Sequence, residues 1–382
     1  MPMVVLMCRI DGFSGGVERH ILQLANHLDC RRFEPVVCAI ANQGELYRIA
    51  NKEGIEKEFI PMPSRLGVGS AARVLAEIAR RRGAGLLHTF GLRSNALAAR
   101  ARQSLAIPWI VRLPNINSTD YANPLRGWIS HWYNNRLIRR ADALQVISPQ
   151  LRQYVEGWKR PPRHIYLIRN GVDLDEFDRE DVASSIRDDL QIPFDAPVIG
   201  TTGRLVPVKG YDLLIEAFAA VRKHSPAARL VIVGEGPEQA RLERIARQKG
   251  VEDAVCIAGY TPDVKPYLAA FDLFVCSSHS EGVPNSVLEA MAIGLPVIAT
   301  KVGGMESIIE DRREGTLIPP GEVGALANAL HVWLHRREEY IRMGELARAR
   351  IRREFSLEQM VNAVETMYDE AVARFAADQR SS

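Results

Sequence analysis

Residues 281–304, EGVPNSVLEAMAIGLPVIATKVGG, contain a loop, the start of a helix, a buried strand and a glycine pair. Pro284 and Asn285 stand where the helix is expected to start, because Asn and Ser are favoured at helix N-caps. The run PVIA that follows is typical of a buried strand. Alternating helices and strands build α/β proteins, so this stretch predicts that class. Glu281 and Glu289 flank the helix start, and two carboxylates in such a place can hold a ligand rich in hydroxyl groups.

The same alternation of short apolar runs and amphipathic helices continues along the rest of the chain. The expected strands are 4–8, 35–40, 86–90, 109–113 and 143–148 in the first half and 198–202, 229–233, 255–258, 273–276 and 296–299 in the second, with helices at 16–28, 71–82, 211–223 and 239–249. Repeated βαβ units of this kind build parallel sheets. The sequence therefore predicts two Rossmann-like domains that face each other across a cleft, and the cleft is the default ligand site.

The boundary between the two domains is expected in the segment NGVDLDEFD, residues 170–178, because it is rich in turn-forming residues. We expect a first domain over residues 1–178 and a second over residues 179–355. A last helical pattern begins at Ser356, so residues 356–382 are expected to form a separate C-terminal helix.

The composition is that of a soluble globular protein. Hydrophobic residues make up 47% of the chain and charged residues 25%, which is enough to build a sizeable core. No apolar run approaches the ~20 residues that span a bilayer, and MPMVVLMCRI at the N-terminus is interpreted as a first strand and not as a signal peptide. The five cysteines, Cys8, Cys30, Cys38, Cys256 and Cys276, lack paired metal-type spacing, so we expect reduced thiols and a cytoplasmic protein.

Basic charge is concentrated toward the N-terminus. Residues 1–180 hold 26 Lys and Arg against 17 Asp and Glu, although the whole chain has a net charge of only +3. The excess indicates either a solvated basic surface or attraction to anionic lipid or to a phosphorylated acceptor. The stretch PLRGWISHWYNNRLIRR, residues 124–140, leaves a related alternative open: its tryptophans either pack into the domain or lie with its arginines at a membrane surface. Because no nucleic-acid-binding module is recognisable, we expect no nucleic-acid partner.

Two loops have features of a diphosphate site. The helix start at Asn285 favours anions, because N–H groups in a first turn lack partners within the helix. The loop GRLVPVKG, residues 203–210, follows an expected strand and carries Arg204 and Lys209 on either side of a proline. Two fixed cations stabilise a leaving diphosphate, whose charge grows as its bond to a sugar breaks. Taken singly, the features also fit a self-capping helix and an ordinary basic loop.

Together these motifs resemble the Glu-x7-Glu signature and its companion loops in the retaining glycosyltransferases of family 4, which have the GT-B fold. The other matching stretches are SGGVERH, residues 14–20, VGEGPE, residues 233–238, and AGYTPDVKPYLAAFD, residues 258–272. The resemblance implies catalytic roles for Glu281, Arg204 and Lys209, and donor-binding roles for Gly15, Gly16, Gly234, Tyr260, Thr261, Gly282, Val283, Asn285, Ser286, Leu288 and Glu289.

The resemblance also implies how the donor is held. Glu281 would hold hydroxyls of the transferred sugar, Glu289 the ribose hydroxyls, and the two cations the diphosphate of a UDP- or GDP-sugar, with no metal or other cofactor. The second domain would bind the nucleotide sugar and the first the acceptor, and the terminal helix would cross back to the first domain.

The sequence departs from the family pattern on the acceptor side. Many members carry a histidine after the strand that reads PWIVRLPN here, residues 108–115, and no histidine follows in this chain. The candidate acceptor-side residues are His88, Arg112 and Asn115, and Arg112 would suit an anionic acceptor. Asp173 and Asp175 form a D-x-D pattern, but the segment is interpreted as the domain junction, so no metal site is expected.

The predicted protein is a retaining, metal-independent hexosyltransferase. It would move a sugar from a nucleoside-diphosphate sugar to a lipid-linked, saccharide or small-molecule acceptor, in cell-envelope or exopolysaccharide synthesis. The alternatives are a nucleotide-sugar-binding scaffold that has lost transfer and a sugar-nucleotide 2-epimerase on the same fold. A cytoplasmic location is expected, either free or with peripheral attachment to the inner face of the membrane.

Overall fold

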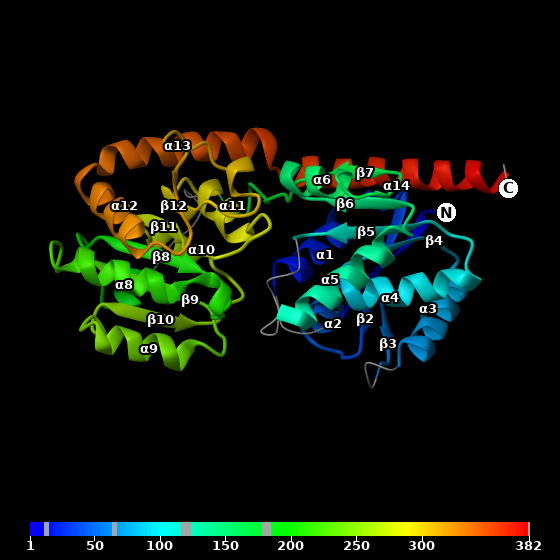
Figure 1. Ribbon diagram of the computed structural model, residues 1–382, viewed down its shortest axis with the longest axis horizontal. Helices are drawn as coiled ribbons and strands as arrows, with labels where there is room; N and C mark the ends of the chain where they lie inside the picture. Colours follow the sequence, from blue (N-terminus) through cyan, green and yellow to red (C-terminus); the bar gives the residue numbers. More distant parts are fainter. Residues whose placement is uncertain (11–14, 63–66, 116–123, 178–184, 381–382) are drawn as a thin grey trace. The chain divides into compact units, whose positions relative to one another are not determined.

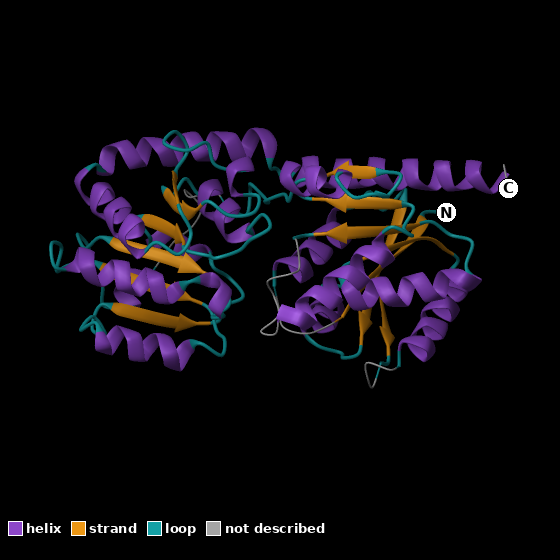
Figure 2. Ribbon diagram, viewed as in Figure 1, coloured by secondary structure: helices purple, strands orange, loops and turns teal. Residues whose placement is uncertain are grey.

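The structure is a computed structural model that describes residues 1–10, 15–62, 67–115, 124–177 and 185–380, with the backbone alone at 124–127. The chain divides into two compact units (Figure 1). Unit 1 comprises Met1–Gly171 and Leu357–Ser382, and unit 2 comprises Val172–Ser356. Each unit is built on one parallel sheet with helices on both faces (Figure 2), which confirms the predicted α/β class.

Unit 1 contains a seven-stranded sheet in the order β3-β2-β1-β4-β5-β6-β7. Its strands are β1 (Met3–Ile10), β2 (Phe33–Ile40), β3 (Lys57–Ile60), β4 (Ala84–Thr89), β5 (Trp109–Leu113), β6 (Ala143–Val146) and β7 (Ile165–Leu167). Its helices are α1 (Gly16–His27), α2 (Glu45–Lys52), α3 (Val68–Arg82), α4 (Leu92–Ala101), α5 (Pro124–Ile138), α6 (Pro149–Glu156) and α14 (Leu357–Arg380), with a 3-10 turn, η1 (Arg102–Ser104).

The C-terminal helix α14 completes the core of unit 1. One face of the sheet is covered by α1, α2 and α14, whose apolar side chains form a single buried cluster with β1, β4 and β5. Tyr368 and Val364 of α14 are fully buried in it. Its acidic side is also anchored, because Glu365 accepts hydrogen bonds from the backbone N–H of Asp29 and from Arg32, at 2.7 and 2.6 Å.

Unit 2 contains a six-stranded sheet in the order β10-β9-β8-β11-β12-β13. Its strands are β8 (Val198–Thr202), β9 (Arg229–Val233), β10 (Val255–Gly259), β11 (Leu273–Cys276), β12 (Val297–Thr300) and β13 (Thr316–Ile318). Its helices are α7 (Ile186–Asp189), α8 (Tyr211–Arg222), α9 (Gln239–Gln248), α10 (Lys265–Ala270), α11 (Asn285–Ala292), α12 (Val323–His335) and α13 (Arg337–Glu354), with 3-10 turns η3 (Pro207–Lys209) and η4 (Met305–Ser307).

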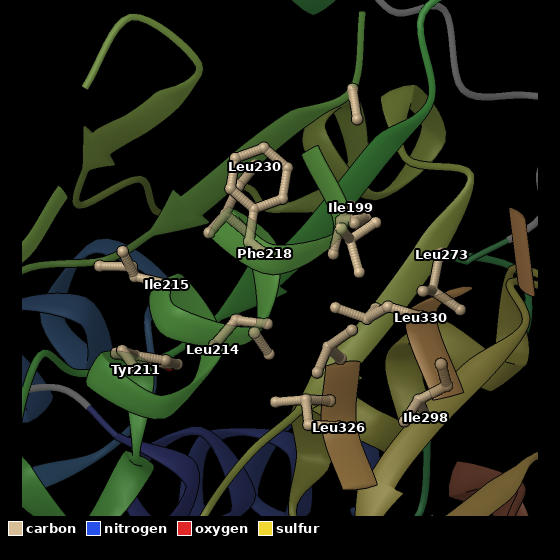
Figure 3. Close-up of a cluster of buried hydrophobic side chains, with 14 of the residues drawn as sticks. Ile199, Tyr211, Leu214, Ile215, Phe218, Leu230, Leu273, Ile298, Leu326 and Leu330 are labelled. Atoms are coloured by element: carbon tan, nitrogen blue, oxygen red, sulfur yellow. The ribbon is translucent and has the colours of Figure 1, made fainter. Parts of the chain in front are cut away.

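The core of unit 2 lies between its sheet and the helices α8, α9 and α12. Phe218 and Leu214 of α8 meet Ile199 and Leu230 of the sheet and Leu330 of α12 (Figure 3), and all five are fully buried. Ile199, Leu214, Phe218 and Leu230 are apolar positions of predicted strands and helices, so the hydrophobic pattern of the sequence accounts for their packing. Leu330 lies in α12, which was not predicted. Among the described residues, no helix is both long and apolar enough to cross a bilayer.

The expected element boundaries differ from the structure by a few residues. The helix expected at 71–82 begins at Val68, and the last helix, expected over residues 356–382, runs from Leu357 to Arg380. Helix α11 begins at Asn285 as predicted, but the N-cap position is occupied by Pro284 and no side chain caps the first turn. The expected Asn or Ser cap was therefore wrong, because the extended Pro284 already sets the chain direction into the helix.

Candidate active site

The carboxyl ends of β8 and β11 mark the point where the strand order of unit 2 reverses. The sheet extends from β8 through β9 and β10 on one side and from β11 through β12 and β13 on the other. Ligands of open α/β sheets bind at such switch points, because adjacent loops there turn away from each other. Residues 203–210 and 277–284, which contain two of the predicted site loops, follow these two strands.

An ion pair joins the two loops. Lys209 Nζ lies 2.7 Å from Glu281 Oε1, and Ser278 Oγ donates to the same oxygen at 2.7 Å. The two charged side chains are largely buried, with 19% and 12% of their surfaces exposed. Burial is the largest single effect and lowers the pKa of Lys209, but the charge of Glu281, the neighbouring Tyr211 and Cys276 and the hydrogen bond to Glu281 together raise the pKa above its usual range. Lys209 is therefore a permanently charged, fixed cation beside a carboxylate.

Hydroxyl side chains fix the backbone around this ion pair. Ser277 Oγ donates to the carbonyl oxygen of Lys209 at 3.0 Å, and Thr300 Oγ1, at the end of β12, donates to the carbonyl oxygen of Ser278 at 2.6 Å. These bonds connect the loops that follow β8, β11 and β12. The positions of Lys209 and Glu281 are consequently set by the ends of three neighbouring strands.

The glycine pair at the end of the stretch 281–304 closes on its beginning. Gly303 has φ +55°, and a Cβ there would lie 1.8 Å from the carbonyl oxygen of Glu281. The next residue, Gly304, donates its N–H to the carbonyl oxygen of Gly282 at 2.7 Å. A residue with a side chain at 303 would therefore displace the loop that carries Glu281.

Helix α11 carries other predicted donor-side residues. Glu289 is only 7% exposed and Val283 only 6%. Leu288 is fully buried, while Gly282, Asn285 and Ser286 are partly exposed. Burying a carboxylate costs free energy unless it has hydrogen-bonding or ionic partners. Glu289 is therefore not an ordinary acidic residue on the surface of a helix.

Arg204 differs from Lys209 in its surroundings. The structure exposes Arg204 at the surface, and its side chain has no hydrogen bond or ion pair to another described residue. The two predicted cations are thus not equivalent, because Lys209 is held in the buried pair and Arg204 is exposed.

The predicted nucleotide-side residues lie in the loops after β9 and β10. Gly234 has φ +148°, and a Cβ there would lie 2.0 Å from the carbonyl oxygen of Gly203, so the loops after β8 and β9 are in close contact. Tyr260 is 49% exposed. Thr261 Oγ1 closes a tight turn, because it donates to the carbonyl oxygen of Asp263 at 2.8 Å and accepts the N–H of the same residue at 3.2 Å.

Unit 1 has its own reversal of strand order, between β1 and β4. Gly15 is the N-cap of α1 and Gly16 is its first residue, while Ser14, which begins the SGGVERH motif, lies outside the described residues. Arg9, at the end of β1, donates to Glu18 of α1 at 2.8 Å and to the carbonyl oxygen of Phe90 at 2.7 Å. This arginine thereby connects the two strand ends with the first turn of α1.

A buried polar cluster lies close by, at the end of β4 and β5. His88 Nδ1 lies 2.8 Å from the hydroxyl of Tyr368, and burial, with a smaller contribution from the charge of Arg112, lowers the pKa of His88 to about 3. Arg112 is 3% exposed and donates to Asn170 Oδ1 at 2.7 Å. Burial, followed by the charge of Arg9, lowers the pKa of Arg112 to about 9.

The structure brings two of the three predicted acceptor-side residues together, His88 and Arg112, and places both inside unit 1. Asn115, after β5, is partly exposed. His20 of α1 also belongs to the cluster, because burial and the charges of Arg112 and His88 hold its pKa well below the usual range. His20 was not predicted as a site residue, although the matching stretch SGGVERH, residues 14–20, ends on it.

The D-x-D segment forms a turn. Asp173 Oδ1 accepts the backbone N–H groups of Asp175 and Glu176 at 3.1 and 3.2 Å. Across the described part of the chain, no three His, Cys, Asp or Glu side chains are grouped in a way that could hold a metal ion.

Two protein-family models match the chain, one on each unit. The model for the glycosyl transferase 4-like domain matches residues 15–171, and the model for glycosyl transferases group 1 matches residues 182–350. The chain belongs to the family 4 type of glycosyltransferases. The resemblance inferred from the motifs is thereby confirmed, and so is the GT-B fold that it implied.

This glycosyltransferase has relatives that are named for the synthesis of envelope polymers. It is 29% identical over 360 residues to the lipopolysaccharide core biosynthesis glycosyltransferase LpsE of Rhizobium meliloti, covering 92% of this chain and 95% of that protein. It is 33% identical over 254 residues to the putative teichuronic acid biosynthesis glycosyltransferase TuaC of Bacillus subtilis, covering 65% of this chain and 61% of that protein. The fold matches Anabaena HepE, solved with UDP and glucose, with a TM-score of 0.85 at 22% identity, covering 96% of this chain and 99% of that one.

Three hydroxyl residues of this glycosyltransferase were not identified from the sequence: Ser277, Ser278 and Thr300. Each one lies at the carboxyl end of a strand or within two residues after it, which is where a parallel sheet places its site residues. Their position at predicted strand ends could have identified these residues as candidates for the site. The bonds themselves were not predictable, because they depend on how far each strand extends relative to its neighbour.

Proposed function

We propose that this glycosyltransferase is a retaining, metal-independent enzyme that moves a sugar from a UDP- or GDP-sugar to an acceptor in cell-envelope or exopolysaccharide synthesis. The observation that carries the proposal is the buried Lys209–Glu281 pair at the switch point of unit 2, with its 2.7 Å separation. One nucleotide sugar bound there would meet a cation for its diphosphate and a carboxylate for its hydroxyls. The names of the envelope-polymer relatives and the UDP complex of HepE support the choice of pathway and donor.

In this proposal the donor is held along the carboxyl edge of the second sheet. Lys209 and the exposed Arg204 would bind the diphosphate, together with the backbone of Gly282 and Val283 just before α11. Glu281 would accept hydrogen bonds from the transferred sugar and Glu289 from the ribose. The remaining donor contacts would come from Gly15, Gly16, Gly234, Tyr260, Thr261, Asn285, Ser286 and Leu288.

The proposed transfer occurs on one face of the sugar. The bond between the anomeric carbon and the diphosphate oxygen breaks, a bond to the acceptor oxygen forms on the same side, and the acceptor's proton passes to the departing phosphate. Lys209 stabilises the charge that collects on that phosphate, which is the kind of interaction that grows toward the transition state. Lys209 cannot act as the base, because its pKa is raised above its usual range by Glu281.

On the acceptor side we propose His88, Arg112 and Asn115. Because Arg112 is buried and donates to Asn170, its charge would act on an anionic acceptor from within the end of the sheet. The acceptor would be lipid-linked, a saccharide or a small molecule. We further propose a cytoplasmic location and attraction of the basic first unit to an anionic membrane.

Nucleotide binding is tested first, by thermal shift with UDP, GDP and their sugars, because a ligand that binds only the folded state raises its melting temperature. Donor hydrolysis and transfer are then followed with the best ligand. Binding with neither hydrolysis nor transfer to any acceptor would favour a scaffold, and epimerised donor would favour a 2-epimerase.

Two variants test the assignment of the carboxylates. Glu281→Ala is expected to lower kcat by about a hundredfold or more with little change in nucleotide affinity, because it removes a contact to the reacting sugar. Glu289→Ala is expected to weaken nucleotide binding by about tenfold, the loss of roughly one good hydrogen bond. Glu216→Ala is the matched control, since Glu216 forms a surface pair with Lys249 at 3.3 Å. The opposite pattern in the two variants would overturn the assignment.

The anionic acceptor is tested by Arg112→Met. We expect a raised acceptor KM with unchanged donor binding by thermal shift. An unchanged acceptor KM would remove the anionic acceptor from the proposal and leave Arg112 as a structural residue.

A further inference from the structure

The solvent-facing side of α5 is unusually apolar. Trp128, Ile129, Trp132 and Tyr133 have 65%, 51%, 56% and 44% of their surfaces exposed. They lie on two adjacent turns of one helix, so they form one continuous patch. The other large exposed hydrophobic side chains among the described residues are scattered along the chain, at Met1, Phe194, Tyr260, Ile341 and Leu346. A clustered patch of this kind marks a binding surface, whereas single exposed residues do not.

The opposite side of α5 is anchored in unit 1, which fixes the direction of the aromatic patch. Leu137 and Ile138 are buried. Asn134 is also buried, and its Oδ1 accepts the side-chain N–H of Asn95 at 2.9 Å. The helix therefore has a polar asparagine inside and two tryptophans outside. Burial of exposed tryptophans is favourable, so this side of the helix suits an apolar partner.

The charges around the patch favour an anionic partner. Arg136 lies on the exposed part of the helix, and the exposed Arg139 and Arg140 follow directly after its last residue, Ile138. Arg139 lies over the ring of Trp158 at 5.1 Å. Lys159 and Arg160, which follow Trp158, are also exposed. No Asp or Glu occurs in the sequence between Asp120 and Asp142. Residues 121–141 therefore carry cations and no carboxylate, and the exposed Glu156, close to Trp158 in the sequence, is paired with Arg152 at 2.8 Å.

We propose that the exposed side of α5 docks this protein onto an anionic lipid bilayer. Trp and Tyr prefer the boundary between headgroups and acyl chains, and arginines beside them pair with anionic headgroups. A helix that lies in the plane of the surface can insert Trp128 and Trp132 while Arg136, Arg139 and Arg140 remain at the headgroups. The inference makes the membrane association proposed above specific to one helix, and it rests on no step of the transfer chemistry.

Binding is tested by flotation of the whole protein with vesicles that contain about 30% phosphatidylglycerol, at about 0.05 M and 0.5 M salt. We expect binding that falls in high salt and is weak to vesicles of phosphatidylcholine alone. The double variant Trp128→Ser, Trp132→Ser is expected to lose at least about tenfold in vesicle affinity. The control Phe194→Ser replaces a residue that is 95% exposed in unit 2 and is expected to change nothing.

Quenching by brominated lipid gives a readout that identifies the residues. Trp109 and Trp333 are 0% and 1% exposed, so lipid should not reach them, whereas Trp128 and Trp132 should be quenched. Quenching that persists undiminished in the double variant would contradict the proposal, as would absence of vesicle binding at low salt. Self-association that disappears in the double variant, without vesicle binding, would identify the patch as a protein interface and also overturn the lipid assignment.

The test is independent of the proposed enzymatic activity. The double variant should keep the wild-type melting temperature and its response to nucleotides, because the two tryptophans are exposed and belong to unit 1. Failure of vesicle binding with normal transfer would remove only the membrane inference. Vesicle binding without any transfer would remove only the proposed enzyme.

Discussion

At the scale of single residues, Gly303 is the position of the candidate site where a side chain would be most disruptive. Its φ of +55° and the carbonyl oxygen of Glu281, 1.8 Å from the position of a Cβ, act together against any side chain. We expect Gly303→Ala to destabilise unit 2 by about 3 kcal/mol or more, the sum of left-handed strain and a backbone clash. Activity should fall as well, because the loop of Glu281 must move.

Gly321→Ala is the matched control for this change. Gly321 also has a positive φ, +79°, but nothing lies within 4 Å of a Cβ there. Only the strain remains, so a loss of about 1–2 kcal/mol is expected in urea unfolding, with full activity. Equal losses in the two variants would show that the contact with Glu281 does not matter.

His88 makes a second prediction at this scale, on pH. Its pKa of about 3 in the folded protein lies below the ordinary value of 6.5, so below about pH 6.5 the unfolded chain binds a proton that the folded protein does not. Stability is therefore complete above pH 6.5 and is lost as the pH falls toward 3. When the pH is lowered from 7 to 5, the free energy of unfolding of His88→Gln should fall by about 1–2 kcal/mol less than that of the wild type. His27→Gln, at an exposed position, is the control. If the stability of His88→Gln depended on pH as steeply as that of the wild type, the lowered pKa of His88 would be contradicted.

The sequence predicted which loops carry the site residues, but it did not predict which of these residues contact each other. Glu281 and Lys209 could be assigned to loops at strand ends, because apolar runs and glycines locate those ends in the sequence. Their ion pair was not predicted, and neither was the difference between a buried Lys209 and an exposed Arg204. Both depend on loop paths that arise from contacts between distant segments, such as that of Gly303 with Glu281.

At the scale of elements, α14 shows how a helix distant in sequence stabilises a sheet. Its pattern predicted a helix, and its apolar side fills the core of unit 1 with Tyr368 and Val364. The sequence pattern gives an apolar side but not its partner. The resemblance to the family, in contrast, implied a return to the first domain, and the structure assigns α14 to the same unit as residues 1–171.

The anchor of α14 is tested at Glu365. Its side chain is 9% exposed and accepts from Arg32 and from the backbone N–H of Asp29. Glu365→Ala leaves both donors without this acceptor. We therefore expect the free energy of unfolding of unit 1, measured in urea, to fall by about 1–3 kcal/mol. Asp378→Ala, further along the same helix, removes an exposed pair with Arg163 at 3.7 Å and should cost less than about 0.5 kcal/mol. Similar losses in the two variants would mean that the Glu365 anchor contributes nothing.

At the scale of the whole molecule, the two units differ in how the chain closes them. Unit 2 is one continuous segment whose ends meet, because Val172 donates its N–H to the carbonyl oxygen of Phe355 at 2.9 Å and pairs with Ser356. Its main core cluster lies wholly between Ile199 and Met343. Unit 1 is assembled from two segments, since α14 follows unit 2 in the sequence.

This difference predicts the behaviour of fragments. Residues 172–356 should fold alone and unfold cooperatively, because the segment contains its own core and its paired ends. If the donor site lies on this unit, UDP or GDP should raise the melting temperature of the fragment, and Glu289→Ala should reduce the rise. Residues 1–171 should be aggregated or loosely packed, since the cluster that buries Tyr368 and Val364 would be open to water; adding residues 357–382 through a linker should restore folding. A cooperatively folded fragment 1–171 would show that α14 is not needed for the core of unit 1.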